Sequence, residues 1–126
     1  ASSPSKVKVS AVAKPASARD SQGSFAEKAA PMFVVTITYT QPIEAIEART
    51  AEHRAWVDQQ VADGLIIAAG PMVPRTGGIL IVRSGVAKAE LEALLKADPF
   101  QVHGLADYVV TEFNAGKRNA ALEPFV

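Results

Sequence analysis

Residues 49–72 read RTAEHRAWVDQQVADGLIIAAGPM, and this stretch decides the fold of the chain. Its first half follows the period of an α-helix, and Asp63-Gly64 ends that helix because glycine readily takes the left-handed conformation of a helix cap. Its second half is a short apolar run that stops at Gly70-Pro71, which predicts a buried strand over residues 65–69. We therefore expect a helix that passes directly into a strand.

His53 lies at the centre of the helix face that we expect to pack inward. At about 100° per residue, Ile46, Val57 and Gln60 lie near it, whereas the acidic residues of the helix point away. A buried imidazole needs a hydrogen-bond partner, because an unpaired buried polar group costs on the order of 1–3 kcal/mol. Two interpretations stay open: a histidine satisfied within the core, and a histidine that opens onto a pocket. Arg49, one turn earlier, favours the pocket unless it only extends along the helix edge into solvent.

The composition excludes several classes of protein. The 126 residues carry 13 basic and 13 acidic side chains, and five of the basic ones precede residue 32, so the remainder has no basic patch for nucleic acid. The lack of cysteine excludes disulfides and thiolate chemistry, and two histidines without metal-site spacing predict no metal or other cofactor. No apolar run approaches the roughly 20 residues that span a membrane. We expect a cytoplasmic protein that binds neither nucleic acid nor membranes.

The chain divides into two parts. Residues 1–31 are rich in Ala, Ser, Lys and Pro and lack an apolar period, which is typical of a flexible N-terminal extension, an expression leader or a basic targeting-type segment. Residues 32–126 form the expected domain and end in a polar tail. Within this domain we expect strands at 33–39, 65–69, 79–83 and 108–113, a helix of about 20 residues from Pro42, a second helix at 87–97 and a short helical turn at 99–103.

This β-α-β-β-α-β order predicts a ferredoxin-like α+β sandwich, in which one antiparallel sheet carries both helices on one face. The first strand has apolar or β-branched residues on both sides, so the opposite face of the sheet would expose a large apolar surface. We expect a second copy of the chain to cover that face, which makes the protein a homodimer.

Four motifs occur in order along the domain: the β-branched first strand, Arg49 followed by His53, DGLIIAAGP at 63–71, and ADPF at 97–100 followed by Gly104-Leu105. In these motifs the chain from Met32 to about Phe113 resembles the YCII family, also called YciI-like proteins, which are related to muconolactone isomerase. The resemblance implies a ferredoxin-like dimer in which His53 and Asp98 meet in a pocket as a dyad. It also implies dehydrochlorination of chlorinated hydroxyhydroquinones during aromatic degradation.

A positioned histidine can take a proton and return it near physiological pH, which suits proton abstraction and elimination. A carboxylate on its second nitrogen would fix the tautomer and stabilise the imidazolium. Asp98 has the right side chain, although Asp followed by Pro is also typical of a helix N-cap. The two roles are compatible, because one carboxylate oxygen can cap the turn while the other faces the pocket.

Three basic residues are candidate donors to a developing oxyanion or a departing anion: Arg49, Arg75 and His103. Arg75 lies in an expected loop and could instead be solvated, and His103 could only close the short turn. The aromatic residues Trp56 and Phe100, with Tyr39 and Tyr108, could line the pocket, although aromatic side chains on core faces more often serve packing.

The sequence leaves three functions open. The first is an acid–base enzyme on a small cyclic or aromatic substrate, either a dehydrochlorinase-type lyase or a muconolactone-type isomerase. The second is a ligand-binding or regulatory dimer that uses the same pocket without turnover. The third is a structural dimer in which His53 only satisfies a core hydrogen bond.

Overall fold

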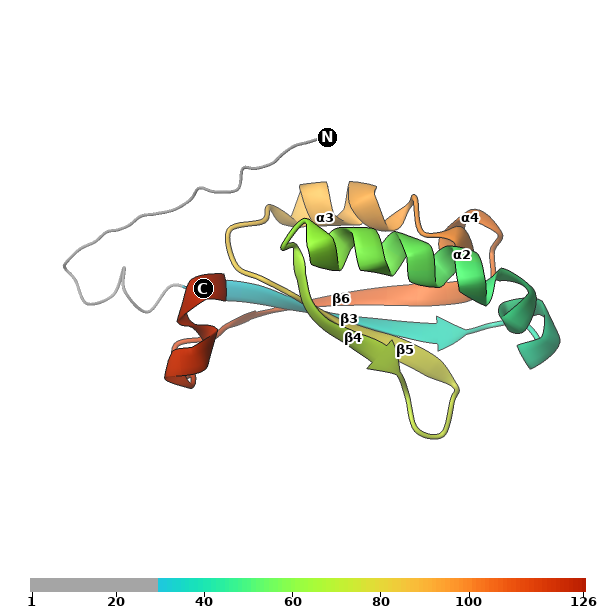
Figure 1. Ribbon diagram of the computed structural model, residues 1–126, viewed down its shortest axis with the longest axis horizontal. Helices are drawn as coiled ribbons and strands as arrows, with labels where there is room; N and C mark the ends of the chain where they lie inside the picture. Colours follow the sequence, from blue (N-terminus) through green and yellow to red (C-terminus); the bar gives the residue numbers. More distant parts are fainter. Residues whose placement is uncertain (1–29) are drawn as a thin grey trace.

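The computed structural model describes residues 30–126 (Figure 1). The extension expected over residues 1–31 lies outside the described residues except for its last two. Ala30 donates its backbone N–H to Asn114 Oδ1 at 2.7 Å, and Pro31 begins a strand. The sheet therefore begins at Pro31, within the segment expected to be an extension, and Ala30 is held beside it by Asn114.

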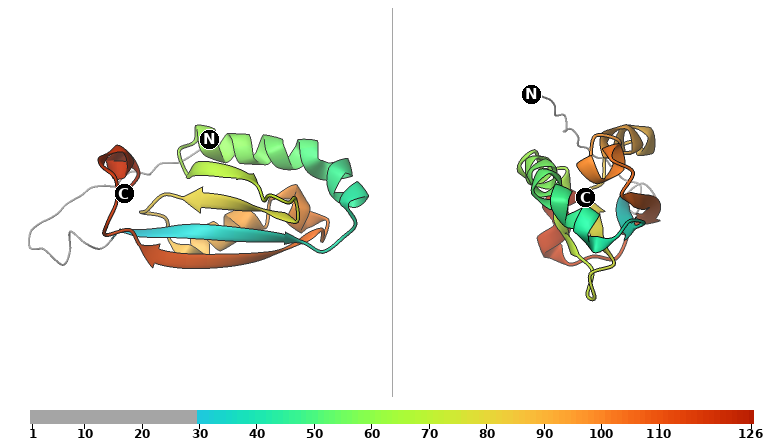
Figure 2. Two further views of the ribbon diagram at one scale, coloured as in Figure 1. Left: turned by 90° about the horizontal axis from the view of Figure 1, so that it is seen from below. Right: turned by 90° about the vertical axis from the view of Figure 1, so that its right-hand side faces the viewer.

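The predicted β-α-β-β-α-β order and ferredoxin-like α+β fold are confirmed. The strands form one antiparallel sheet in the order β4-β5-β3-β6, and the helices lie on one face of it (Figures 1 and 2). The elements in chain order are β3 (Pro31–Tyr39), α2 (Ile43–Ala62), β4 (Ile66–Pro71), β5 (Gly77–Val82), α3 (Lys88–Leu95), α4 (Pro99–Val102), β6 (Ala106–Asn114) and the 3-10 helix η2 (Ala120–Phe125).

Helix α2 presents to the sheet the face that its sequence predicts. Ile46 and Gln60 are buried near its two ends, and His53 is half-buried between them. The helix ends in the expected glycine cap: Gly64 has a φ of 83°, Leu65 donates its N–H to the Gln60 carbonyl, and Gly64 donates to the carbonyl of Val61. This cap turns the chain directly into β4, so the position of α2 over the sheet is fixed by local sequence.

The main core lies between the sheet and the helices. The central strand β3 contributes its alternate side chains to the core, the neighbouring β5 contributes two more, and α3 covers them. The buried members of this cluster are Phe33, Val35, Ile37, Ile66, Leu80, Val82, Leu91 and Leu95. Alternate residues of β3 face this core, and the residues between them lie on the outer face of the sheet. This alternation explains why the first strand has apolar or β-branched residues on both sides.

Several element boundaries differ from the sequence prediction. Gly77 and Gly78, which we expected in a loop, are the first residues of β5. A Cβ on Gly77 would lie 1.8 Å from the Ile37 carbonyl oxygen, so only glycine permits this close approach of β5 to β3. The second helix is shorter than expected and ends at Leu95.

The outer face of the sheet is only partly covered. At one end, Val126 packs with Met32 and Ile81, and Ser84 donates its backbone N–H to the Phe125 carbonyl at 3.0 Å, so the polar tail closes this end through its last residues. Toward the other end Val109 is 58% exposed on β6. Among residues 30–126, no helix is both long and apolar enough to span a membrane.

Candidate active site

A cavity of about 260 Å³ lies between α2 and the sheet, beside β4 and β5. Its apolar wall includes Ile37, Leu80 and Phe100, and the paired strands β4 and β5 contribute small residues such as Ala69 and Gly78. Because these residues are small, they leave open the space of the cavity, which larger side chains would fill. The polar side chains around the cavity are Tyr39, Thr50, His53, Arg54, Asp58 and Arg75.

His53 and Asp98 form a hydrogen-bonded pair at this cavity. His53 Nδ1 lies 2.7 Å from Asp98 Oδ1, and the exposed fractions of the two side chains are 16% and 0%. A carboxylate only accepts hydrogen bonds, so Nδ1 carries the proton of the neutral ring and Nε2 keeps a free lone pair. The neutral ring of His53 is therefore held in the tautomer that leaves Nε2 available as a general base.

Asp98 also caps α4, but not in the way that we expected. Its Oδ1 accepts from the backbone N–H of Phe100 at 3.1 Å and serves His53 as well, whereas we assigned these roles to different oxygens. The second oxygen, Oδ2, instead accepts a 2.5 Å hydrogen bond from the Tyr108 hydroxyl. The buried carboxylate of Asp98 thus accepts hydrogen bonds from His53 and Phe100 at Oδ1 and from Tyr108 at Oδ2.

Tyr108, which was expected as a possible lining residue, is not part of the cavity wall. Its hydroxyl is instead hydrogen-bonded to Asp98. Burial raises the pKa of Tyr108 far above its ordinary value, and the hydrogen bond to Asp98 and its negative charge raise it further. The phenol therefore stays protonated and remains a donor.

Two aromatic rings fix the plane of the His53 imidazole. Phe100 stacks on it with ring centroids 4.1 Å apart and an angle of 7°, and Trp56 lies 6.5 Å away at 25°. Phe100 also lines the cavity, whereas Trp56 packs against the main core and does not. Both rings therefore lie close to His53, but of the two only Phe100 faces the cavity, as the predicted lining residue Tyr39 also does.

Arg75 reaches the cavity from the β4–β5 loop, and three groups hold its guanidinium. Nη2 donates to Thr50 Oγ1 at 3.1 Å, Nε donates to the Tyr39 hydroxyl oxygen at 3.4 Å, and Nη1 lies 3.8 Å from Glu47 Oε2. Because Thr50 donates its own proton to the Ile46 carbonyl, its lone pairs are free for Arg75. The side chain is thus anchored and not simply solvated.

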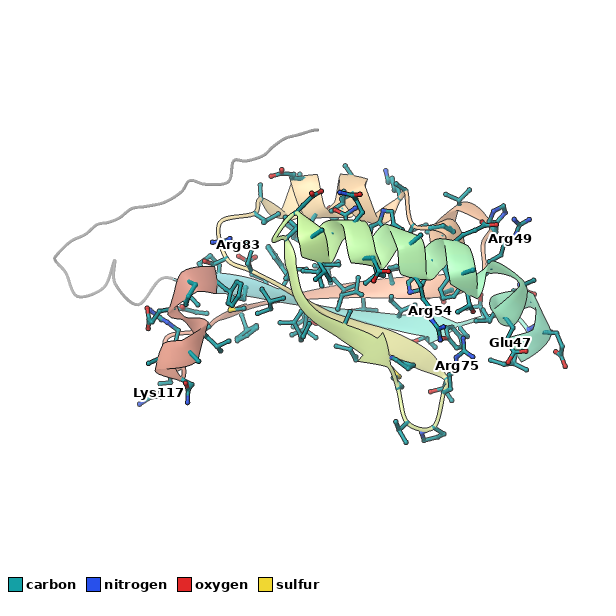
Figure 3. All side chains as sticks on the ribbon, viewed as in Figure 1. Glu47, Arg49, Arg54, Arg75, Arg83 and Lys117 are labelled. Atoms are coloured by element: carbon teal, nitrogen blue, oxygen red, sulfur yellow. The ribbon has the colours of Figure 1, made fainter. Side chains whose placement is uncertain are left out.

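Arg49 and His103 do not line the cavity. Arg49 Nη1 contacts Glu52 Oε2 at 3.0 Å, and His103 Nε2 lies 4.0 Å from Glu52 Oε1. On the helical wheel Arg49 and Trp56 lie about 40–60° to one side of His53, and the cavity opens on the other side. Figure 3 shows Arg49 on the upper side of α2, whereas Arg54 and Arg75 lie below the helix.

Sequence reasoning missed two residues of the cavity wall, Arg54 and Asp58. Both lie about 100–140° from His53 on the helical wheel, so the wheel alone places them away from the inward face of α2. They share the side of His53 on which Thr50 and Val57 lie, and that side faces the cavity. The signal that could have found them is the direct passage of α2 into β4, which places β4 along this side of the helix.

Within residues 30–126, no three His, Asp or Glu side chains come together as metal ligands. The chemistry that the cavity offers from its own residues is proton transfer at His53 and stabilisation of negative charge by Arg75 and Arg54.

Comparison with known proteins agrees with the fold. Residues 32–114 match the profile of the YCII-related domain. Among solved structures, the fold is similar to that of 5-chloro-2-hydroxyhydroquinone dehydrochlorinase from Burkholderia phenoliruptrix AC1100, in complex with 2,5-dihydroxybenzoquinone. The two chains are 21% identical, with a TM-score of 0.57, over 66% of this chain and 93% of the other. A search of curated proteins found no match.

Proposed function

This chain belongs to the YCII family, and on that basis we propose that it is a cytoplasmic lyase that removes hydrogen chloride from a small chlorinated hydroxyhydroquinone. His53 acts as the general base and Asp98 as its partner. The observation that carries the proposal is the 2.7 Å hydrogen bond between Nδ1 of His53 and the fully buried Asp98, with the ring at the wall of a cavity of about 260 Å³.

The proposed reaction begins when His53 Nε2 takes a phenolic proton from the substrate. The ring electrons shift toward the carbon that carries chlorine, and that carbon accepts a proton, for which the imidazolium is the source. Chloride then leaves with the electron pair of the C–Cl bond as a second phenolic proton is lost. The product is a hydroxyquinone, and one proton and one chloride are released for each substrate.

Asp98 supports each proton transfer. It holds Nδ1–H, so the basic Nε2 is available for the substrate, and its negative charge stabilises the imidazolium that forms. Arg75 lies at the same cavity and supplies guanidinium donors for the phenolate or for the departing chloride. Arg54 adds a second positive charge to this cavity, so we assign it to substrate binding as well.

The similar structure from Burkholderia phenoliruptrix supports the choice of substrate, because that protein is a dehydrochlorinase of a chlorinated hydroxyhydroquinone and binds a dihydroxybenzoquinone. Its ligand is a small planar ring with oxygens on opposite sides. The cavity of this chain also pairs a flat aromatic wall, formed by Phe100, with polar groups. A planar polyphenol matches that combination in size and polarity.

The direct test is chloride release from 5-chloro-2-hydroxyhydroquinone, measured with an ion-selective electrode while absorbance follows the quinone. We expect turnover by the unaltered protein and a loss of at least about 10³-fold for His53→Asn, with the fold retained. Glu92→Gln, on the exposed part of α3, serves as the control. Binding without chloride release would favour a ligand-binding protein, and isomerisation of a lactone without chloride release would assign the chain to the isomerases.

We also propose that the functional unit is a homodimer that pairs the outer faces of two sheets. The support is the apolar residues of this face: Val34 and Ile81 are paired on β3 and β5, and Val109 on β6 lies opposite Thr36, the next outward residue of β3. Contiguous exposed apolar surface of this kind marks association sites.

Two exposed valines provide a matched test of the dimer. Val109 on the outer face is 58% exposed, and Val102 on α4, on the helical side, is 61% exposed. We expect Val109→Arg to convert the protein to a monomer in light scattering after gel filtration, while Val102→Arg leaves the dimer intact. Equal masses for both variants and the unaltered protein would contradict this assignment of the interface.

A further inference from the structure

The buried Asp98 carboxylate is held from two directions. Oδ1 accepts from His53 Nδ1 and from the Phe100 backbone N–H, so α4 fixes one oxygen. Oδ2 accepts from the Tyr108 hydroxyl, which belongs to β6 on the far side of the carboxylate. A carboxylate with only one oxygen fixed can still turn about its Cβ–Cγ bond. The Tyr108 hydrogen bond therefore sets the plane in which Oδ1 meets the imidazole.

Tyr108 also controls how much negative charge reaches His53. A fully buried carboxylate is stabilised by the hydrogen bonds that it accepts, and each donor draws part of the charge. The hydroxyl of Tyr108 draws charge toward Oδ2 and away from Oδ1. Since burial raises the pKa of Tyr108, the hydroxyl remains protonated and does not compete with Asp98 as an anion.

We propose that Tyr108 is a positioning residue, the third member of a buried chain in which Tyr108 orients Asp98 and Asp98 orients His53. Tyr108 does not line the cavity, so it acts only through Asp98. Its effect on turnover rests on the proposed function, but its effect on the hydrogen bond between Asp98 and His53 does not.

The test is Tyr108→Phe, which keeps the ring that packs in the core and removes only the hydroxyl. In proton NMR we expect two resonances to move downfield, the Nδ1 proton of His53 and the amide proton of Phe100, because both donate to Oδ1 and Oδ1 then carries more charge. Tyr39→Phe is the matched control. It removes a hydroxyl from a tyrosine whose ring packs on Phe100 at 5.8 Å but that does not bond to Asp98, and both resonances should stay in place.

A second substitution tests the same link without removing a hydrogen bond. 3,5-Difluorotyrosine at position 108 is a stronger donor, so the His53 and Phe100 protons should move upfield. Unchanged resonances, or shifts in the opposite direction, in either altered protein would overturn the proposal even if stability falls, since a purely structural tyrosine would alter stability alone.

Kinetics separate this inference from the proposed function. If the reaction is as proposed, Tyr108→Phe lowers kcat about tenfold and changes KM less than about twofold, because the substrate never touches Tyr108. NMR shifts without any turnover by the unaltered protein would leave the buried chain in place and refute the assigned reaction. A raised KM with unchanged kcat would contradict the positioning role.

Discussion

Helices α2 and α4 are joined by two pairs of histidine and carboxylate, one buried and one exposed. In the buried pair, His53 and Asp98 lie 2.7 Å apart, with 16% and 0% of their side chains exposed. In the exposed pair, His103 Nε2 and Glu52 Oε1 lie 4.0 Å apart, with 37% and 50% exposed. In both pairs a histidine and a carboxylate thus link α2 to a cap of α4, but in different surroundings.

The difference shows that anchoring, and not residue type, distinguishes a candidate catalytic pair. Asp98 is fixed by the Phe100 amide and by Tyr108, and His53 is fixed by the stacked ring of Phe100. Glu52 is shared between His103 and Arg49 in solvent, where an ion pair contributes only about 0.2–1 kcal/mol. Only the first pair has the fixed geometry that proton transfer requires.

The sharpest test of this comparison replaces the carboxylate in each pair with its amide. Asp98→Asn keeps an oxygen to cap α4 but loses the charge that stabilises the imidazolium and selects the Nδ1 tautomer, so we expect kcat for chloride release to fall about 10³–10⁴-fold. Glu52→Gln should change kcat less than about twofold, because solvent already screens that pair. Similar losses in the two variants, with circular dichroism showing both folded, would mean that anchoring does not distinguish the pairs.

The sequence could predict the two residues of the buried pair but not the side of α2 on which the cavity opens. His53 on an inward face and Asp98 before a proline are local signals, and both were correctly placed on their elements. The direction in which the cavity opens was not predictable from the helix alone, because it depends on which side of α2 lies along β4. For that reason Arg54 was missed and Arg49 was given weight.

A second prediction compares the two arginines. Arg75 is held at the cavity by Thr50 and Tyr39, so Arg75→Met, which keeps the aliphatic stem, should lower kcat/KM about 10²-fold through the loss of oxyanion or chloride stabilisation. Arg49→Met should have little effect on kcat/KM, because Arg49 contacts Glu52 outside the cavity. A larger loss for Arg49→Met than for Arg75→Met would return Arg49 to the site.

The fold was more predictable than the site, since it rests on local periodicity. The change from helical to strand period at Gly64 fixed the order of α2 and β4, and the glycine cap appears where the sequence places it. The start of β5 was not predictable. Gly77 is required there by the close approach of Ile37 on β3, which is adjacent in the sheet but far away in the sequence. The hydrogen bond between Tyr108 and Asp98 was missed because it joins β6 to a buried cap and leaves no spacing signal in the sequence.

A third prediction concerns the free energy of unfolding at high pH, which depends on Tyr108 beside the buried pair and not on the exposed pair. Tyrosine in an unfolded chain titrates near pH 10, and burial and Asp98 raise the pKa of Tyr108 in the folded protein. Above about pH 10 the unfolded chain therefore loses a proton that the folded protein keeps, so the free energy of unfolding falls by up to about 1.4 kcal/mol per pH unit from this group. Below that pH the contribution of Tyr108 is fully present.

Urea unfolding between about pH 9 and 11 measures this slope. Tyr108→Phe should flatten it relative to the unaltered protein, whereas Tyr39→Phe and Glu52→Gln, which both keep Tyr108, should retain it. Because the unaltered protein and Tyr108→Phe share every other titrating group, the difference in slope between these two proteins isolates the buried phenol. An equally steep slope in Tyr108→Phe would show that the Tyr108 hydroxyl ionises in the folded state as readily as in the unfolded chain. Tyr108 would then not be a lasting hydrogen-bond donor to Asp98, and it could not orient His53 through Asp98.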